Sequence, residues 1–308
     1  HLMTLDGNRE VPVHGDSDRA TELSKRIHAL SQADVRRNTL HKVLTVPVQW
    51  MRLCATLRRL QCEVLISFME RANIFSLLTP GRHKRIISIR KHLSMALAAK
   101  TKPKRLLIRL VYPWLLGRAD GINFNSQEAA NDFQNVFPVS GENISVISNS
   151  CDRELIHEMA KEPLPEEWAA VYDKPVVLAC GRLVKAKGFE HLLRAFQPVS
   201  IKYPDLRLVI VGDGPLKQEL QRLTRNLKIE HSVSLPGHQV NPFAWMGRAS
   251  FFVLSSLAEG FPNVLLEAMT LGLPVISTAC PSGPREILDD SKSLDRNISE
   301  IYLTKYGM

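Results

Sequence analysis

The stretch Phe251-Phe-Val-Leu-Ser-Ser-Leu-Ala-Glu-Gly-Phe-Pro-Asn-Val-Leu-Leu-Glu267 predicts a strand, a loop and a helix, in that order. The short apolar run from Ser250 to Leu254 is typical of a buried strand. Pro262 is a natural first residue of a helix, so residues 263–271 are predicted to be helical. A strand followed at once by a helix is the repeating step of an α/β fold.

Short apolar runs and helical patterns alternate in the same way through the rest of the second half of the chain. Glycine or polar turns follow nearly every strand-like run. This alternation predicts a parallel sheet with helices packed against its faces. The strand-like runs are Pro175–Cys180, Leu206–Val211, Val233–Leu235 and Pro274–Ser277, and the helical runs are Glu190–Ile201 and Leu216–Leu227.

The first half of the chain has a looser pattern of the same kind. The proline-rich acidic run Lys161–Glu167 is typical of a linker, and a length of 308 residues favours two domains. We therefore expect two α/β domains, at residues 1–165 and 166–308. Predicted strands of the first are Val64–Ser67, Arg85–Ile89, Gly121–Phe124 and Ile144–Ile147, and predicted helices lie near residues 41–60, 92–117 and 126–136.

The composition is that of a soluble globular protein. Apolar residues make up 44% and charged residues 23% of the chain, which excludes a disordered, collagenous or coiled-coil protein. No run reaches the roughly 18 apolar residues of a membrane span, and the start lacks the pattern of a signal peptide. Five scattered cysteines without a Cys-x-x-Cys pair predict free thiols in a reducing compartment. We therefore expect a cytoplasmic protein without a zinc site.

Two glutamates, Glu259 and Glu267, lie on either side of the predicted helix start. Open α/β sheets bind ligands at the edge where strands end and helices begin, and a helix N-terminus favours phosphate. A carboxylate accepts two hydroxyls at once, so this pair suits a polyol beside a phosphate, as in a nucleotide-sugar. A pair of solvated surface glutamates is the alternative. The Gly260-Phe-Pro-Asn263 segment and the preceding strand favour the binding role.

A second signal is the loop Gly181-Arg-Leu-Val-Lys-Ala-Lys-Gly188, directly after a strand-like run. Arg182 can bind a diphosphate through two parallel hydrogen bonds, and Lys187 can act on it as a point charge. An ordinary basic turn is the alternative. The loop is expected at the same edge of the sheet as the glutamates, and this coincidence favours a diphosphate site.

A third loop at this edge is Gly212-Asp-Gly-Pro215. It is not a dinucleotide fingerprint, because Lys217 stands where the third glycine would be. We interpret it as a turn near the nucleotide base, with a plain structural turn as an equal alternative.

In their order and spacing, four motifs resemble those of the group 1 glycosyltransferases, family four of the sequence-based classification. The resemblance is specific over residues 176–288 and looser over residues 41–152. It implies the GT-B fold class: α/β, with two Rossmann-like domains whose parallel sheets face a central cleft. The motifs are Gly181–Gly188, Val211-Gly-Asp-Gly-Pro215, Glu259-Gly-Phe-Pro-Asn263 and Glu267-Ala-Met269, and looser likenesses to strand ends are Ile66–Asn73, Asn123–Ser126 and Val146–Asn149.

The resemblance also implies roles for single residues in a transfer that retains the anomeric configuration. Arg182 and Lys187 would stabilise the departing diphosphate, which itself helps to deprotonate the acceptor, and Glu259 would anchor the transferred sugar. These three are the expected catalytic residues, and no metal or other cofactor is expected. The expected donor-binding residues are Gly181, Gly212, Gly214, Pro215, Gly260, Phe261, Pro262, Asn263, Val264 and Glu267, the last on the ribose, and the expected acceptor-side residues are Arg90, Ser126 and Asn149.

The chain departs from the family pattern in several places. The family begins with a strand and a glycine-rich loop that nothing at the start of this chain supplies, and its last units are not recognisable after Ile287. Family members commonly have Asn-Gly-Val-Asp where this chain has Asn149-Ser-Cys-Asp152, and many have Ser-Glu-Arg-Asn where it has Ser88-Ile-Arg-Lys91. We therefore expect a chain that is shortened at both ends.

Basic residues are in excess, with 40 Lys and Arg against 31 Asp and Glu, and the net charge of +9 favours anionic partners. Residues 82–118 contain many basic and no acidic residues. Apolar residues such as Leu106, Leu110 and Trp114 interleave with them at helical spacing, which suits an anionic membrane surface. A core-packed helix with a solvated basic face is the alternative. Nucleic acid is not an expected partner, because aromatic residues are only 6% and no recognition motif is present.

Together these features predict a retaining glycosyltransferase of bacterial envelope polysaccharide or glycan synthesis. It would move a sugar from a UDP- or GDP-linked donor to a saccharide or lipid-linked acceptor, in the cytoplasm and peripherally on the inner face of the cell membrane. One alternative is a donor-binding remnant of such an enzyme without turnover. Another is a nucleotide-sugar epimerase of the same fold, against which the spacing of the two glutamates counts.

Overall fold

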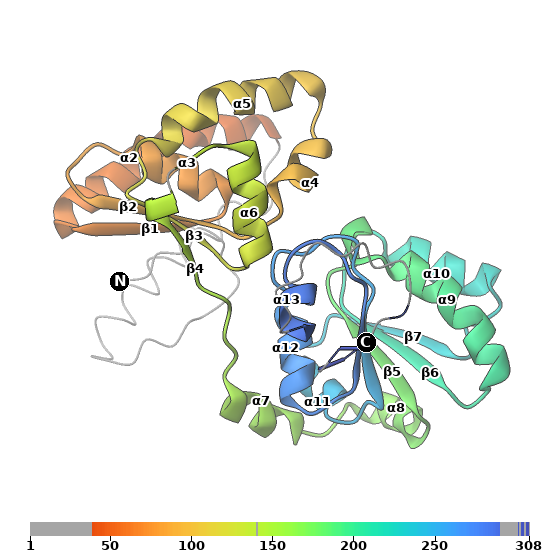
Figure 1. Cartoon of the computed structure of the whole chain (residues 1–308). Helices are drawn as coiled ribbons and strands as arrows, with labels where there is room; N and C mark the ends of the chain where they lie inside the picture. Colours follow the sequence, from red (N-terminus) through yellow and green to blue (C-terminus); the bar gives the residue numbers. More distant parts are fainter. Residues whose placement is uncertain (1–38, 140, 290–300, 302, 305, 308) are drawn as a thin grey trace. The chain divides into compact units, whose positions relative to one another are not determined.

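A computed structural model of the protein describes residues 39–139, 141–289, 301, 303–304 and 306–307 (Figure 1). The chain forms two compact units. Of the described residues, the first unit contains those up to Ile89 together with Leu106–Asn123 and Val139–Ser145, and the second contains Arg90–Arg105, Phe124–Pro138 and those from Val146 onward. The predicted domain boundary at residue 165 stays a prediction. The predicted shortening at the chain ends concerns mainly residues outside the described part.

The first sheet has four strands in the order β1-β2-β3-β4. All four lie where the sequence predicts them. Strands β1 and β2 are parallel, in a register that runs from Val64 opposite Lys84 to Phe68 opposite Ser88. The strands are β1 (Val64–Phe68), β2 (Lys84–Ile89), β3 (Gly121–Phe124) and β4 (Ile144–Val146).

One prediction in this half is wrong. The helix expected near residues 92–117 is two helices, α4 (Leu93–Ala98) and α5 (Lys102–Leu116). Pro103 lacks a backbone N–H and is best accommodated in the first turn of a helix, and α5 begins one residue before it. The other helices of this half are α2 (Thr39–Leu60), α3 (Glu70–Leu78), α6 (Gln127–Val136) and the 3₁₀ turn η2 (Gly141–Asn143).

The second sheet has five strands in the order β7-β6-β5-β8-β9, and the strand pairs are parallel. The chain winds from β5 outward to β7 on one side and then returns to place β8 on the other side of β5. This reversal beside β5 is a topological switch point, where open α/β sheets bind ligands. The strands are β5 (Val176–Cys180), β6 (Arg207–Val211), β7 (Val233–Gly237), β8 (Phe251–Leu254) and β9 (Val275–Ser277).

Strand β5 is buried along its whole length because helices cover both faces of the sheet. Val176 and Leu178 pack on one face, with α11 and α12, whereas Val177 and Ala179 pack on the other, with α9 and α10 (Figure 1). The helices are α7 (Arg153–Ala160), α8 (Glu166–Ala169), α9 (Phe189–Lys202), α10 (Lys217–Asn226), α11 (Pro242–Met246), α12 (Asn263–Thr270) and α13 (Pro284–Leu288), with 3₁₀ turns η3 (Ala170–Asp173) and η4 (Lys185–Lys187).

Trp245 is the largest fully buried side chain, and the rings of Trp168 and Tyr172 lie 5.8 and 6.1 Å from it. We expect Trp245→Ala to lower the free energy of unfolding of the second unit by about 3–5 kcal/mol, because it leaves a large cavity. Ile201→Ala, at a side chain of the same unit that is 75% exposed, should change it by no more than about 0.5 kcal/mol. Urea denaturation followed by circular dichroism checks this, and equal effects would contradict the packing described here.

Candidate functional site

The loops after β5, β6 and β8 emerge from the same edge of the second sheet, because parallel strands end together. They bring together the motifs around residues 181–188, 212–215 and 255–263. Each motif thus occupies the edge and the switch point at which ligands bind in this class of sheet.

The first two loops are held together backbone to backbone. The N–H of Leu183 donates to the carbonyl of Asp213 at 2.9 Å, and the N–H of Leu216 donates to the carbonyl of Leu183 at 3.1 Å. Gly212 has a φ of +147°, and a Cβ atom there would lie 1.9 Å from the Gly181 carbonyl oxygen. Only glycine fits this position. The loop of residues 212–215 therefore has a demonstrable packing role beside its predicted place near a nucleotide base.

The loops after β5 and β8 are joined in the same manner. Ser255 donates from its hydroxyl to the carbonyl of Lys187 at 2.9 Å. The N–H of Leu257 donates to the carbonyl of Ala186 at 2.8 Å. These bonds fix the backbone of Lys187 relative to the loop that carries Glu259.

Lys187 and Glu259 form an ion pair at the centre of this edge. The distance from Lys187 Nζ to Glu259 Oε1 is 2.6 Å, and the two side chains are only 21% and 11% exposed. Ser256 donates from its hydroxyl to the same carboxylate oxygen at 2.5 Å. The stem of Lys187 passes over Gly181, whose lack of a side chain leaves room for it.

The position of Ser256 is fixed by the neighbouring strand. Its side chain is buried, with 1% exposure, and its backbone carbonyl accepts a hydrogen bond of 2.5 Å from the hydroxyl of Thr278, just after β9. Ser256 and Thr278 belong to the site, although the sequence analysis missed both of them. The only signal for Ser256 is that it follows a buried strand at the ligand-binding edge.

Arg182 and Glu267, the other two charged residues predicted for the donor site, differ in their exposure to solvent. Arg182 is exposed to solvent in the same loop as Lys187. Glu267 is half-buried on α12. Burial raises the pKa of the thiol of Cys180, the last residue of β5, and the nearby carboxylate of Glu267 raises it further. Glu267 is therefore at the end of the central strand.

Helix α12 begins at Asn263, as predicted, with Pro262 in the capping position before it. Gly260 lies against the backbone of Arg90, so that a Cβ atom there would be 2.1 Å from the Arg90 carbonyl oxygen. Phe261 is half-buried, and Val264 packs against the apolar core. The first turn of α12 therefore lies directly after the loop that carries Glu259.

Two of the three predicted acceptor-side residues join this group within the second unit. Arg90 donates from Nη2 to the Oδ1 atom of Asn149, and Asn149 donates from Nδ2 to the Oδ1 atom of Asn263 at 2.6 Å. Ser126 is fully buried, and its hydroxyl accepts from the N–H of Ala129 at 3.2 Å. Ser126 therefore caps α6, and its predicted acceptor-side role stays a prediction.

A further contact within the second unit was missed by the sequence analysis. The carboxylate of Glu286 accepts from the N–H groups of Gln127 and Glu128 at 2.8 and 2.6 Å, at the N-terminus of α6. Glu128 in turn accepts from the N–H of Ser282 at 2.8 Å, and burial raises the pKa of Glu128. A carboxylate at a helix N-terminus is stabilised by the helix dipole, so this contact ties α13 to α6.

Cys280 is a buried thiol close enough to the ion pair for the charge of Glu259 to act on it. Burial, followed by the Glu259 carboxylate, raises its pKa to about 11. The thiol is therefore protonated at neutral pH and is a poor nucleophile.

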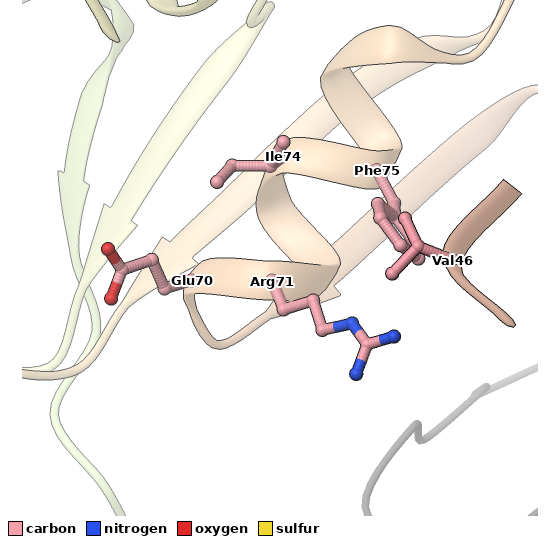
Figure 2. Close-up of a pocket in the computed structure, with 5 residues that line it drawn as sticks. All are labelled: Val46, Glu70, Arg71, Ile74 and Phe75. Carbon is pink, nitrogen blue, oxygen red and sulfur yellow. The ribbon is translucent and has the colours of Figure 1, made fainter. Parts of the chain in front are cut away.

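A hollow in the first unit is separate from these residues. It is lined by Val46 of α2 and by Glu70, Arg71, Ile74 and Phe75 of α3 (Figure 2). Arg71 donates to Gln49 at 2.7 Å and lies over the ring of Phe75. None of the predicted site residues lines it.

Within residues 39–139, 141–289 and the few described beyond them, no cluster of three or more His, Cys, Asp or Glu side chains could hold a metal ion. No helix in this part of the chain is both long and apolar enough to cross a membrane.

Comparison with known families and proteins gives consistent matches. The family model described as Glycosyl transferases group 1 matches residues 160–300, which contain all the loops of the site. An uncharacterized glycosyltransferase of Methanocaldococcus jannaschii is 37% identical over 203 residues, which are 66% of this chain and 50% of that protein. The chain thus spans half the length of this archaeal relative.

A bacterial relative is matched over more of its length. It is the Campylobacter jejuni N-acetylgalactosamine-N,N'-diacetylbacillosaminyl-diphospho-undecaprenol 4-alpha-N-acetylgalactosaminyltransferase. The two proteins are 30% identical over 272 residues, which are 87% of this chain and 71% of that enzyme.

Solved structures show the same fold. Anabaena HepE in complex with UDP superposes with a TM-score of 0.67 at 20% identity, over 88% of this chain and 73% of HepE, and HepE was also solved with UDP-glucose. The lipopolysaccharide outer core galactosyltransferase WaaB has a TM-score of 0.55 at 22% identity, over 81% of this chain and 66% of WaaB. The predicted α/β fold class of GT-B type is confirmed by these likenesses. By its sequence match to the Campylobacter enzyme and to the family model, this chain belongs to the group 1 glycosyltransferases.

Proposed function

We propose that this protein transfers a sugar from a UDP- or GDP-linked donor to a saccharide or lipid-linked acceptor, with retention of anomeric configuration and without a metal ion. The reaction would serve the synthesis of lipopolysaccharide or another envelope polysaccharide. The observation that carries this proposal is the largely buried pair of Lys187 and Glu259 at the switch point of the second sheet. It combines a cation for phosphate with a carboxylate for hydroxyls, the two functions that a nucleotide-sugar requires.

The relatives support this choice of substrates. The Campylobacter relative is named for transfer to a diphospho-undecaprenol-linked saccharide, and HepE binds UDP and UDP-glucose. A Salmonella typhimurium relative, 34% identical over 155 residues, is named a lipopolysaccharide 1,6-galactosyltransferase. Among the proteins that this chain resembles, one thus binds a nucleotide-sugar and others are named for transfer to a glycan.

Lys187 would neutralise the diphosphate. Its ammonium group can donate three hydrogen bonds, so a phosphate oxygen adds to its bond with Glu259 or competes with it. Arg182, which is exposed in the same loop, would close on the diphosphate from the solvent side. Charge that develops on the leaving diphosphate would be stabilised by both cations, which is why the proposed reaction needs no metal.

The start of α12 would hold the sugar and the ribose. The backbone N–H groups of Gly260, Phe261 and Asn263 lie at or just before a helix N-terminus, which favours a phosphate or a sugar oxygen. Glu267, about one turn into the helix, would accept the ribose hydroxyls. Both groups lie on the same short element, so sugar and nucleoside would bind to one rigid scaffold.

Glu259 would act as the anchor of the transferred sugar. The hydrogen bonds from Lys187 and Ser256 both go to its Oε1 atom, which leaves Oε2 to accept sugar hydroxyls. Lys187 and Ser256 together occupy Oε1, which makes this oxygen less available as a nucleophile. Transfer by direct displacement, with the diphosphate as the base, therefore fits this geometry better than a covalent glycosyl intermediate on Glu259.

The acceptor would approach from the side of Arg90 and Asn149. These residues form a hydrogen-bonded chain that ends on Asn263, the first residue of α12. These hydrogen bonds thus connect the predicted acceptor side to the predicted donor side. A lipid-linked acceptor would place the protein at the inner face of the cell membrane.

Nucleotide titration tests the donor site. We expect Lys187→Gln and Glu267→Gln each to weaken binding of the preferred nucleotide, UDP or GDP, by about 1–3 kcal/mol, the range of a charge-assisted hydrogen bond. Lys185→Gln is the matched control, because Lys185 is an exposed lysine of the same loop. Isothermal calorimetry measures the affinities, and thermal melting verifies that each variant folds. Equal affinities in all four proteins would refute the assignment.

Ser256→Ala tests the anchor of the sugar separately from the nucleotide site. Because Ser256 holds Glu259 but is not expected to touch the nucleotide, we expect UDP-sugar or GDP-sugar binding to weaken roughly tenfold while binding of the free nucleotide stays unchanged. Calorimetry with both ligands measures the two affinities. A parallel loss of both would show that Ser256 only supports the fold of the loop.

Product analysis separates the alternatives. We expect purified protein to release UDP or GDP from its donor only when a suitable saccharide or lipid-linked acceptor is present, and the new glycosidic bond to keep the donor's anomeric configuration by NMR. Nucleotide binding without release in any acceptor screen would favour a remnant without turnover. Isomerisation of the donor sugar in the absence of acceptor would favour the epimerase.

A further inference from the structure

The loop of residues 259–263, which carries the proposed sugar anchor, is enclosed from two sides within the second unit. On one side, a Cβ atom on Gly260 would lie 2.1 Å from the carbonyl oxygen of Arg90. On the other side, the N–H of Gly283 donates to the carbonyl of Gly260 at 3.1 Å, and a Cβ atom on Gly283 would lie 2.7 Å from a backbone atom of the same loop. The position of the loop therefore depends on both neighbours.

Helix α6, which belongs to the same unit, holds the neighbour that contains Gly283. The carboxylate of Glu128, in the first turn of α6, accepts a hydrogen bond of 2.8 Å from the N–H of Ser282. In return, the carboxylate of Glu286 on α13 accepts from the N–H groups of Gln127 and Glu128 at 2.8 and 2.6 Å. Each of the two carboxylates is thus bound to the backbone beside the other, which fixes the start of α6 against the segment that precedes α13.

Ser282 depends on such a partner, because its backbone is strained. Its φ is +77°, in the region that glycine adopts freely and other residues adopt rarely. The residue is fully buried, and its hydroxyl has no hydrogen-bond partner among the residues that the structure describes. A strained conformation persists only where the surrounding structure fixes it, and such residues are frequent at binding sites. Glu128 supplies this fixation through the N–H of Ser282.

The same helix also holds the neighbour on the other side of the loop. The carboxylate of Asp132, one turn further along α6, accepts from the N–H and from the hydroxyl of Ser94, in the first turn of α4. The Nδ1 atom of His92, which precedes α4, lies 3.1 Å from the same carboxylate. Two carboxylates of α6, Glu128 and Asp132, thus act on the two sides that enclose residues 259–263.

We propose that Glu128 is a positioning residue for sugar binding. From α6 it holds the segment before α13 against the loop of residues 259–263, and so keeps Glu259 in the place where it meets the transferred sugar. Glu128 acts only through the protein backbone and does not touch the substrate. That Glu259 binds the sugar rests on the proposed function, whereas the effect of Glu128 on the loop does not.

Glutamine can replace Glu128 in this role, because the bond from Ser282 needs an acceptor oxygen and not a charge. Burial raises the pKa of Glu128 despite the opposing effects of the Ser282 N–H, Arg285 and His92, so an uncharged acceptor suits the same place. Alanine removes the acceptor and leaves the N–H of Ser282 without its partner. Aspartate keeps the charge but withdraws the acceptor by the length of one carbon–carbon bond.

Hydrogen exchange tests the positioning without any ligand. We expect Glu128→Ala to speed amide exchange roughly tenfold in residues 257–263, because loss of a hydrogen bond to a charged group loosens the segment behind the loop. Glu128→Gln should exchange as the unaltered protein does, and Glu128→Asp should show a weaker form of the change. Glu219→Ala is the matched control, since Glu219 occupies the first turn of α10 but is exposed. Mass spectrometry of deuterium uptake measures these rates, and unchanged uptake in β5 verifies that the sheet stays folded. If Glu128→Ala unfolds the sheet, the comparison of Glu128→Asp with Glu128→Gln decides.

Calorimetry tests the consequence for the sugar, with UDP-glucose as the probe and UDP as the reference. We expect Glu128→Ala to weaken binding of UDP-glucose roughly tenfold and to leave binding of UDP unchanged, because the sugar and not the nucleotide meets Glu259. Glu128→Gln and Glu219→Ala should bind both as the unaltered protein does. If the unaltered protein binds neither ligand, UDP-glucose is not its donor, and hydrogen exchange alone decides on the role of Glu128.

Three results would overturn the proposal. One is unchanged exchange in residues 257–263 of the folded Glu128→Ala and Glu128→Asp variants. A second is an effect of Glu128→Gln as large as that of Glu128→Ala, since this would assign the effect to the lost charge and not to the hydrogen bond. The third is an equal loss of affinity for UDP and UDP-glucose, which would make Glu128 a support of the whole nucleotide site.

Discussion

Close backbone contact between the loops after β5, β6 and β8 is the constraint on which the site depends. Gly212 lies so near the Gly181 carbonyl oxygen that no side chain fits between them, and Ser255 bonds directly to the backbone of Lys187. Loops that carry charged groups are usually mobile, but each of these begins at a buried strand and ends at a helix, and hydrogen bonds join the loops to one another. The backbone positions of the charged residues are thereby fixed at the edge of the sheet, and preorganised electrostatic binding requires such fixed positions.

The pair of Lys187 and Glu259 shows how that rigidity is used. Two charges that are largely removed from water attract strongly but cost desolvation energy, and the hydrogen bond from buried Ser256 offsets part of that cost. The pair keeps both groups in place without a ligand. A diphosphate that binds to Lys187 then meets a cation already oriented, and the sugar meets a carboxylate whose Oε1 atom is already engaged. On our proposal, the free protein thus resembles the donor complex at its charged centre.

Much of this arrangement is readable in the sequence, because the strands are short apolar runs and the motifs follow them directly. All nine strands of the described residues lie within two residues of their predicted limits, and the starts of α9, α10 and α12 are equally close. Short helices were missed. Helix α11 has only five residues, too few for a helical pattern, although the capping residue Asn241 and Pro242 at its first position are typical of a helix start. Ser256 and Glu286 escaped notice because Thr278, which donates to Ser256, and Gln127, which donates to Glu286, lie 22 and 159 residues away in the sequence. Side-chain pairing across a fold leaves no local pattern to read.

The same limit applies to α5, because the side on which this helix packs cannot be read from its sequence. Its sequence specifies an amphipathic basic helix, but the direction in which the apolar residues face depends on which of two apolar sides packs on the protein. Ile108, Tyr112 and Leu115 take the inner side, and the larger set faces outward. An exposed apolar face of this size favours aggregation unless a partner covers it. On the proposed function, a membrane that holds a lipid-linked acceptor would cover this face and raise the effective acceptor concentration without any new contact at the catalytic site.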